Sequence, residues 1–264
     1  MMKIQEKFSE LKNKQEGALI GYVMAGDPSP ELTVDIANAL ITGGVDILEL
    51  GLPFSDPIAD GPTIQKSGGR ALKAGMNSDI YFDIIKKINS GIPLVCMTYY
   101  NLILQRGLDK FTQDCRNSGI SALIVPDLPI EESDPLLKEC KNSDIDLIFL
   151  VASTTTEERM KKILDSATGF LYVVSLLGVT GARDKISKGV KPTLDKIRKL
   201  NPKLPLAVGF GISKPEHVKE VLSAGADAAI VGSAFIKIIE ENLGDKDVVM
   251  KKLEEFVNEL KDAT

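Results

Sequence analysis

Two carboxylates stand where acid/base chemistry would be possible. Glu49 lies inside the short apolar segment Asp46–Gly51, and Asp60 lies in the proline-containing acidic loop that follows. Side chains alternate between the faces of a strand, so Glu49 points away from the face that Leu48 and Leu50 share. Burial on that face would raise the pKa of the Glu49 carboxyl toward neutral pH, as a general acid or base requires. This strand and loop therefore predict an acid/base pair.

Both carboxylates also have a structural interpretation. A buried ion pair would account for Glu49, although no basic residue lies nearby in the sequence. Asp60 precedes a glycine, and an Asp–Gly pair in a loop commonly serves only to form a turn. The residues themselves thus favour chemistry at Glu49 and leave the role of Asp60 open.

Two glycine-containing turns, Gly209–Ser213 and Gly232–Ala234, follow the last two apolar segments of the chain. Glycine lets backbone amides approach an anion, and a helix that begins at such a turn adds a favourable dipole. The loops after strands seven and eight of (β/α)8 barrels commonly bind phosphate in this way. We expect a phosphorylated ligand here, with simple tight turns as the alternative. The pattern does not identify the rest of the ligand.

A long connection, 177–190, contains the sequence GVTGAR at residues 178–183. Loops of this length in a compact barrel often act as active-site lids, and glycines at both ends would allow this one to hinge. A variable surface loop is the alternative. Tyr99 and Tyr172 lie near the ends of apolar segments, where they could flank a flat apolar ligand or belong to the core.

The elements that must position these residues alternate regularly along the chain. An amphipathic segment, Ile4–Leu11, comes first, and stretches of helical periodicity then separate short aliphatic segments. Strands this apolar are typical of parallel sheets that are covered on both sides. The predicted strands are Ala18–Met24, Asp46–Gly51, Pro93–Tyr99, Ala122–Pro126, Leu147–Val151, Phe170–Leu176, Leu206–Gly211 and Ala228–Val231.

This alternation predicts the α/β class and a closed (β/α)8 TIM barrel over residues 1–264, with an N-terminal helix and extra helical segments. A doubly wound open sheet is the competing fold. It normally has a glycine-rich phosphate loop after its first strand, and Gly26-Asp27-Pro28 is not such a loop. In a barrel the C-terminal strand ends meet at one mouth, so both carboxylates and both glycine turns would converge there.

The bulk composition excludes several classes of function. A net charge of −5 argues against binding to nucleic acid or to an anionic membrane, since both require a cationic surface. No apolar run approaches the ~20 residues that span a bilayer, and the N-terminal segment lacks the apolar stretch of a signal peptide. We therefore expect a cytoplasmic protein.

Cysteine and histidine give no sign of a metal site. Cys96, Cys115 and Cys140 are widely spaced and form no CxxC pair, which favours small buried hydrophobes. The single histidine, His217, lies in a predicted helix and is interpreted as a solvated residue.

The sequence LELGLPFSDPIADGPTIQ at residues 48–65, followed in order by GVTG, GFGIS and GSA, closely resembles the tryptophan synthase α subunit family. The resemblance covers essentially the whole chain. Its acidic-loop motif is highly specific, whereas many phosphate-binding barrels share the glycine turns. It implies a lyase that cleaves indole-3-glycerol phosphate to indole and glyceraldehyde 3-phosphate. It implies no cofactor on this chain, and a pyridoxal-phosphate β subunit that receives indole through a tunnel in an αββα (α2β2) assembly.

The resemblance also implies roles for individual residues. Glu49 matches the acid/base that protonates indole C3 and takes the glycerol hydroxyl proton, and Asp60 matches the residue that stabilises positive charge on the ring and accepts the N1 proton. Thr180 matches a residue that closes over Asp60. The implied phosphate cradle is Gly181, Gly211, Gly232 and Ser233. The implied pocket is Tyr22, Met97, Tyr99, Leu123, Tyr172, Thr180 and Phe210.

The chain departs from the family pattern in a few places. Tyr22 stands where many members have Phe, Met97 where many have Leu, and Leu176-Leu177 replaces a more polar pair that contains Arg. Two other functions remain open. A sugar-phosphate isomerase barrel would place its two carboxylates on opposite strands, and a non-catalytic activator of a β partner would not need Glu49 and Asp60.

Overall fold

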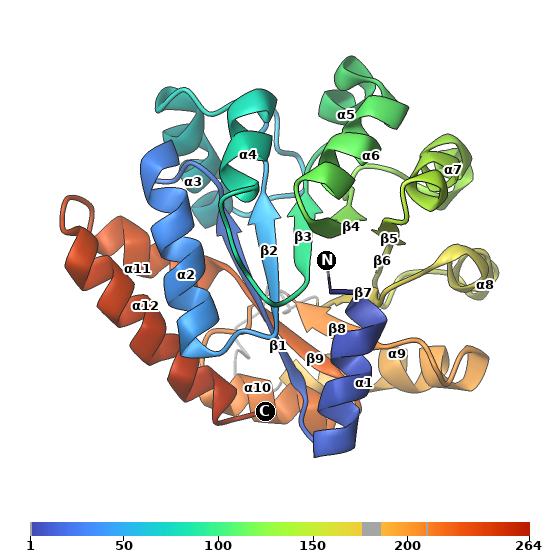
Figure 1. Ribbon diagram of the computed structural model, residues 1–264. Helices are drawn as coiled ribbons and strands as arrows, with labels where there is room; N and C mark the ends of the chain where they lie inside the picture. The colour runs from blue at the N-terminus through green and yellow to red at the C-terminus, as the bar shows by residue number, and fades with distance from the viewer. Residues whose placement is uncertain (1, 176–185, 210) are drawn as a thin grey trace.

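The computed structural model describes residues 2–175, 186–209 and 211–264. All strand pairs in its single sheet are parallel, in the order β5-β4-β3-β2-β1-β9-β8-β7-β6. The strands are β1 Ala18–Met24, β2 Ile47–Gly51, β3 Leu94–Met97, β4 Ile120–Ile124, β5 Asp146–Ile148, β6 Leu150–Val151, β7 Leu171–Val174, β8 Leu206–Gly209 and β9 Ala228–Val231. The first and last strands, β1 and β9, pair in the middle of this order, and Figure 1 shows the sheet curled around on itself.

The two ends of the sheet, β5 and β6, belong to one stretch of chain. The predicted strand Leu147–Val151 is divided at Phe149, with β5 paired to β4 and β6 paired to β7. The Phe149 carbonyl still accepts a hydrogen bond of 3.0 Å from the Tyr172 amide. The division falls where pairing with β4 ends and pairing with β7 begins. The predicted barrel is therefore confirmed, with its fifth strand in two parts.

The helices surround the barrel on the outside, as Figure 1 shows, apart from α1, which lies at its N-terminal end. They are α1 Ile4–Lys14, α2 Thr33–Gly43, α3 Pro62–Lys73, α4 Ser78–Ile85, α5 Tyr100–Arg106, α6 Leu108–Asn117, α7 Asp134–Asn142, α8 Glu157–Ser166, α9 Ile186–Leu200, α10 Pro215–Ser223, α11 Ser233–Glu241 and α12 Lys246–Lys261. Short 3-10 turns at Pro30–Leu32 and Ile130–Glu132 precede α2 and α7. The C-terminal helix α12 packs along α2.

Helices α5 and α9 differ from the prediction. The sequence pattern did not indicate α5, whose first amide, that of Tyr100, donates to the Asp127 carboxylate over 2.9 Å. Helix α9 begins at Ile186, inside the predicted loop 177–190, and continues through Pro192. Val190, Leu194 and Ile197 are all buried, so apolar contacts along one face stabilise α9 over its length.

The barrel interior is filled by a layer of apolar side chains and closed at its N-terminal end by α1. Ile4, Phe8 and Leu11 of α1 are buried against residues on the inner face of the strands. The ring of Phe8 meets that of Phe170 edge to face, with centroids 6.1 Å apart. The predicted amphipathic N-terminal segment is therefore a helix that plugs the barrel.

A buried ion-pair network holds α3 in place, directly after the acidic loop. The fully buried Asp27 carboxylate accepts hydrogen bonds of 2.7 Å from both Nε and Nη2 of Arg70, and a further one from the Ser67 hydroxyl. Arg70 also reaches Glu240 of α11 at 3.4 Å. Because the charges are paired and hydrogen-bonded, the network fixes α3 relative to β1 and α11.

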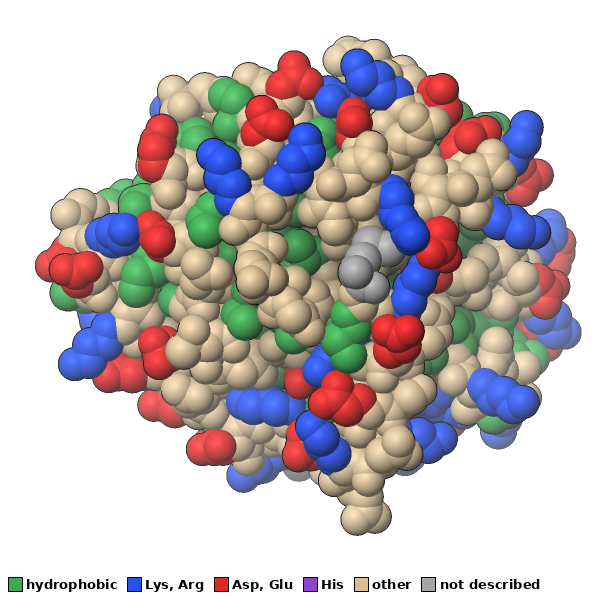
Figure 2. Space-filling view, in the orientation of Figure 1, with side chains coloured by type: hydrophobic (Ala, Val, Ile, Leu, Met, Phe, Trp, Pro, Cys, Tyr) green, Lys and Arg blue, Asp and Glu red, His purple; other side chains and the backbone are tan. Residues whose placement is uncertain are grey.

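The surface has charges of both signs. Figure 2 shows Lys and Arg side chains interspersed with Asp and Glu over one face. In the parts of the chain that the structure describes, no helix is long and apolar enough to cross a membrane.

Candidate active site

Glu49 is buried inside the barrel, with 1% of its surface exposed. Strand β2 aligns it with Tyr22 of β1 and Val95 of β3. Its Oε2 atom has no hydrogen-bond partner among the described residues. Burial, with a smaller contribution from the charge of Asp60, raises the pKa of Glu49 to about 8. At neutral pH Glu49 is therefore mostly protonated.

Asp60 ends the loop between β2 and α3 and is half-buried. Its amide donates to the Pro57 carbonyl over 3.2 Å, and its carbonyl accepts from the Gln65 side chain over 2.9 Å. Burial raises the pKa of Asp60 to about 6, while a hydrogen bond from the Tyr99 hydroxyl acts in the opposite direction. At neutral pH Asp60 is mostly ionised, so the two carboxyls differ in protonation state, as an acid and a neighbouring anion must.

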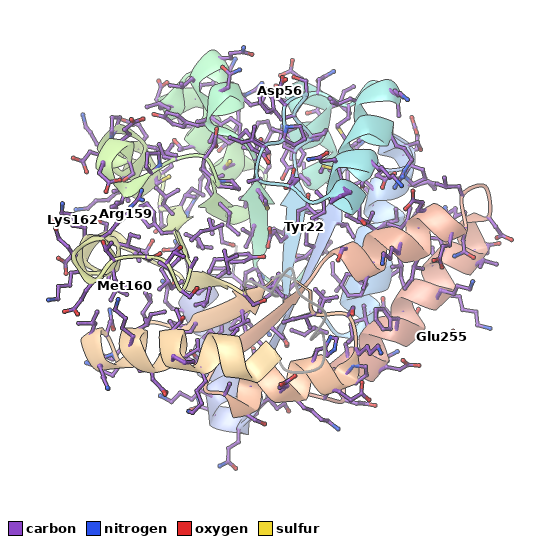
Figure 3. The ribbon with its side chains drawn as sticks, turned by 180° about the vertical axis from the view of Figure 1, so that it is seen from behind. Tyr22, Asp56, Arg159, Met160, Lys162 and Glu255 are labelled. Carbon is purple, nitrogen blue, oxygen red and sulfur yellow. The ribbon has the colours of Figure 1, made fainter. Side chains whose placement is uncertain are left out.

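A cavity of about 220 Å³ brings the two carboxyls together. Figure 3 shows Tyr22, one of its walls, near the ends of the central strands. The cavity also includes several other residues that the sequence analysis named, which are Met97, Tyr172, Gly211, Gly232 and Ser233. It includes others that were not predicted as site residues, although all but Ile230 lie in the motifs quoted from the sequence, and these are Gly61, Pro62, Thr63, Ile64, Ile212 and Ile230. Strand alternation alone could have indicated Ile230, because it shares the inner face with Ala228.

Two glycines leave space for the tyrosine side chains that line the cavity. A Cβ atom at Gly51 would lie 2.5 Å from the Tyr22 hydroxyl, and one at Gly209 would overlap the Tyr172 hydroxyl. No real Cβ atom approaches a neighbour so closely, so both positions require glycine for these side chains to occupy their places.

One end of the cavity is suited to an anion. Gly211 has a φ of +80°, in the left-handed region that favours glycine, and Gly232 directly precedes α11, which begins at Ser233. The first amides of a helix have no partner within the helix and point outward, with the positive end of the helix dipole behind them. Gly211, Gly232 and Ser233 all line this cavity, so hydrogen-bond donors of this kind lie at its edge.

Several predicted pocket residues do not line this cavity. Leu123 is buried in the layer between sheet and helices, while its neighbours Ala122 and Ile124 face the barrel interior. Tyr99 lines a smaller adjacent cavity behind Asp60. The predicted site residues Thr180, Gly181 and Phe210 lie outside the described residues.

The remaining candidates for chemistry lie away from the cavity. His217 of α10 is partly exposed, and its Nδ1 accepts a 3.3 Å hydrogen bond from the Ser213 amide. The three cysteines are buried as free thiols. Within residues 2–175, 186–209 and 211–264, no cluster of three or more His, Cys, Asp or Glu side chains could hold a metal ion.

The fold and the cavity define a class of protein. It is a (β/α)8-barrel enzyme whose mouth combines two carboxyls of different protonation state with the N-terminus of a helix. A family model described as "Tryptophan synthase alpha chain" matches residues 8–264. The chain belongs to the tryptophan synthase alpha chain family, and the resemblance seen in the sequence is confirmed.

Individual relatives agree over nearly the whole length. The tryptophan synthase alpha chain of Methanosarcina barkeri is 57% identical over 259 residues, covering 98% of this chain and 96% of its own. The crystal structure of the alpha subunit from Legionella pneumophila has a TM-score of 0.91 at 35% identity, covering 100% of this chain and 98% of its own. A chain of the Pyrococcus furiosus tryptophan synthase complex has a TM-score of 0.84 at 39% identity, covering 93% of this chain and 98% of its own.

Proposed function

We propose that Glu49 and Asp60 carry out the reaction of the tryptophan synthase alpha chain in this protein. That reaction is the retro-aldol cleavage of indole-3-glycerol phosphate to indole and D-glyceraldehyde 3-phosphate, so the chain is a carbon–carbon lyase of tryptophan biosynthesis. One observation carries the assignment of roles: a buried acid with a raised pKa faces the same cavity as a mostly ionised carboxylate.

In the proposed sequence, the Glu49 carboxyl first donates its proton to indole C3, and the ring becomes an iminium. The Asp60 carboxylate stabilises the positive charge at N1 through the N1–H group and can accept that proton. The Glu49 carboxylate then takes the proton of the hydroxyl on the adjacent glycerol carbon. The O–H electrons form the aldehyde carbonyl, the C–C bond breaks, and its electron pair returns to the ring to give indole.

We assign the remaining predicted residues by position. The phosphate would bind at Gly211, Gly232 and Ser233, where backbone amides of glycine turns and a helix N-terminus support anion binding. Tyr22, Met97 and Tyr172 would flank the indole ring. Gly181 as a phosphate ligand, Phe210 as a pocket wall and Thr180 as the residue that closes over Asp60 remain predictions from the sequence.

The family also defines the cofactor and the partner. The tryptophan synthase alpha chain has no cofactor of its own, because pyridoxal phosphate belongs to the beta subunit, which uses the indole. We propose that residues 1–264 form one catalytic domain, that it joins a beta subunit in an α2β2 tetramer, and that it works in the cytoplasm. Two carboxyls on one strand–loop unit argue against a sugar-phosphate isomerase, and an intact pair argues against a non-catalytic activator.

Indole release from indole-3-glycerol phosphate by the purified chain tests this function. We expect Glu49→Gln to lower kcat by roughly 10²- to 10⁴-fold, the usual contribution of a positioned acid/base, with substrate binding measured by calorimetry retained. Asp56→Asn is the matched control. Asp56 lies in the same loop as Asp60, and its carboxylate is exposed (Figure 3), so this variant should leave turnover unchanged. Substantial turnover by Glu49→Gln, or ketose-phosphate formation in place of indole release, would overturn the assignment.

A further inference from the structure

The C-terminal end of β3 and the residues that follow it are hydrogen-bonded to the acidic loop at several points. The Leu52 amide donates to the Met97 carbonyl over 2.9 Å, and the Thr98 hydroxyl donates to the Leu52 carbonyl over 3.2 Å. Further along the loop, the Ala59 amide donates to the Tyr99 hydroxyl oxygen over 3.0 Å. Consecutive residues of β3 and its extension thus hold both the beginning and the end of the loop.

The Tyr99 hydroxyl interacts with two consecutive residues of this loop. A phenol hydroxyl has one proton to donate and lone pairs to accept with. The Tyr99 hydroxyl accepts from Ala59 and hydrogen-bonds to the side chain of the next residue, Asp60, to which only the hydroxyl can donate when Asp60 is ionised. The Tyr99 ring also stacks on Phe54, with centroids 5.4 Å apart and ring planes at 30°. One side chain therefore fixes the direction of the Asp60 carboxylate.

Tyr99 does not line the cavity that holds Glu49 and the glycine turns. It lines the smaller cavity behind Asp60, together with Phe54, Thr98 and other residues. Its hydroxyl contacts the loop, where it accepts the hydrogen bond from the Ala59 amide. Asp60 lines both cavities and lies beside the residue whose amide Tyr99 holds, so it connects Tyr99 to the site.

We propose that Tyr99 is a positioning residue that aims the Asp60 carboxylate into the cavity, and that it is not part of the substrate wall. The proposal rests on the function proposed above for Asp60. It differs from the role that the family resemblance implied for Tyr99.

The same hydrogen bond has an electrostatic effect. Asp60 also faces the Glu49 carboxyl and the hydroxyls of Tyr22 and Tyr172, and burial of its carboxyl raises its pKa to about 6. The Tyr99 hydroxyl lowers that pKa. Removing the hydroxyl therefore raises the pKa of Asp60, and a larger fraction of Asp60 becomes protonated near neutral pH.

Tyr99→Phe tests the proposal because it keeps the stacked ring and removes only the hydroxyl. We expect kcat to fall about 10- to 100-fold, the usual effect of losing a hydrogen bond to a charged group, with KM within about threefold of the wild type. Tyr100→Phe is the matched control, since it removes the hydroxyl of the adjacent, half-buried tyrosine at the start of α5. It should leave kcat and KM unchanged. A raised KM at unchanged kcat would make Tyr99 a binding wall and overturn the proposal.

Two further measurements separate positioning from a general structural role. The acidic limb of the pH–rate profile should move to higher pH in Tyr99→Phe. Ionisation of the substrate phosphate affects both enzymes equally, so it cancels in the comparison with wild type. The Asp60→Asn, Tyr99→Phe double variant should be no slower than Asp60→Asn alone, because Tyr99 acts through Asp60. Additive losses or an unmoved limb would contradict positioning. Full activity of Asp60→Asn would instead refute the proposed function itself.

Discussion

Glu49 has a predictable effect on stability as well as on catalysis. It is 1% exposed and its Oε2 atom has no hydrogen-bond partner among the described residues, so ionising it inside the barrel is unfavourable. Its pKa is about 8 in the folded protein, against an ordinary value of 4.5. Between these pH values the folded chain keeps a proton that the unfolded chain releases, so this residue makes the fold less stable as the pH rises.

The size of this effect follows from the two pKa values. Each unit of difference corresponds to about 1.4 kcal/mol, so the stability contributed by Glu49 falls by about 3 to 5 kcal/mol between pH 4.5 and pH 8. That is a large part of the roughly 5–15 kcal/mol by which domains are stable. Glu49→Gln keeps the shape of the side chain but cannot ionise. We therefore expect its stability relative to wild type to increase with pH over this interval and to level off above pH 8.

Urea unfolding of wild type and Glu49→Gln, followed by circular dichroism at pH 5, 6, 7 and 8, measures this difference. Other titrating groups cancel between the two proteins, so the difference reports on Glu49. Asp60→Asn is a useful comparison, because its raised pKa of about 6 predicts a difference that is complete near pH 6. Because Asp60 is partly exposed, that difference should also be smaller. A Glu49→Gln difference that stays constant from pH 5 to pH 8 would show that Glu49 is already ionised in the folded protein.

Two further predictions follow from the geometry of the cavity. Lyase activity should rise with pH through about 6, as Asp60 ionises, and decline above about 8, as Glu49 loses its proton. A pH profile of kcat/KM checks this, and activity that keeps increasing to pH 10 would exclude Glu49 as the acid. Gly51→Ala should raise KM about tenfold or more, because the new Cβ would lie 2.5 Å from the Tyr22 hydroxyl and displace that ring. Adding Tyr22→Phe should restore much of the binding, and no restoration in steady-state assays would mean that the displaced atom is not the hydroxyl.

The strands of the barrel were predictable because their burial leaves a simple pattern. Ala18–Met24 and Ala228–Val231 occur with the predicted bounds, since both are continuous apolar segments in the interior of a parallel sheet. Helix α5 was missed because seven residues, Tyr100–Arg106, are too short to show a clear helical period. Its start depends on a hydrogen bond that the Tyr100 amide donates to the Asp127 carboxylate, 27 residues away, which a local pattern cannot show.

The site was predictable where it depends on alternation within one strand, and not where it depends on contacts between segments. Glu49 faces the interior as its place in β2 requires. Leu123, which only the family resemblance placed in the pocket, faces outward because it alternates with the inward-facing Ala122 and Ile124. The contact from the Tyr99 hydroxyl to Ala59 spans 40 residues, and no spacing rule predicts it.

The place of β1 in the sheet has a consequence for how the chain is made. One edge of β1 pairs with β2, but the other pairs with β9, which ends at Val231. At ~5–20 residues per second, a ribosome needs roughly 10 to 40 seconds between the synthesis of the two strands. Throughout that interval the nascent chain presents the open edge of an apolar strand, a template for pairing with other chains. Closing the barrel is thus a late event in synthesis. In a chain that stops short of β9, one edge of β1 has no partner, and β1 is the strand next to β2, which carries Glu49.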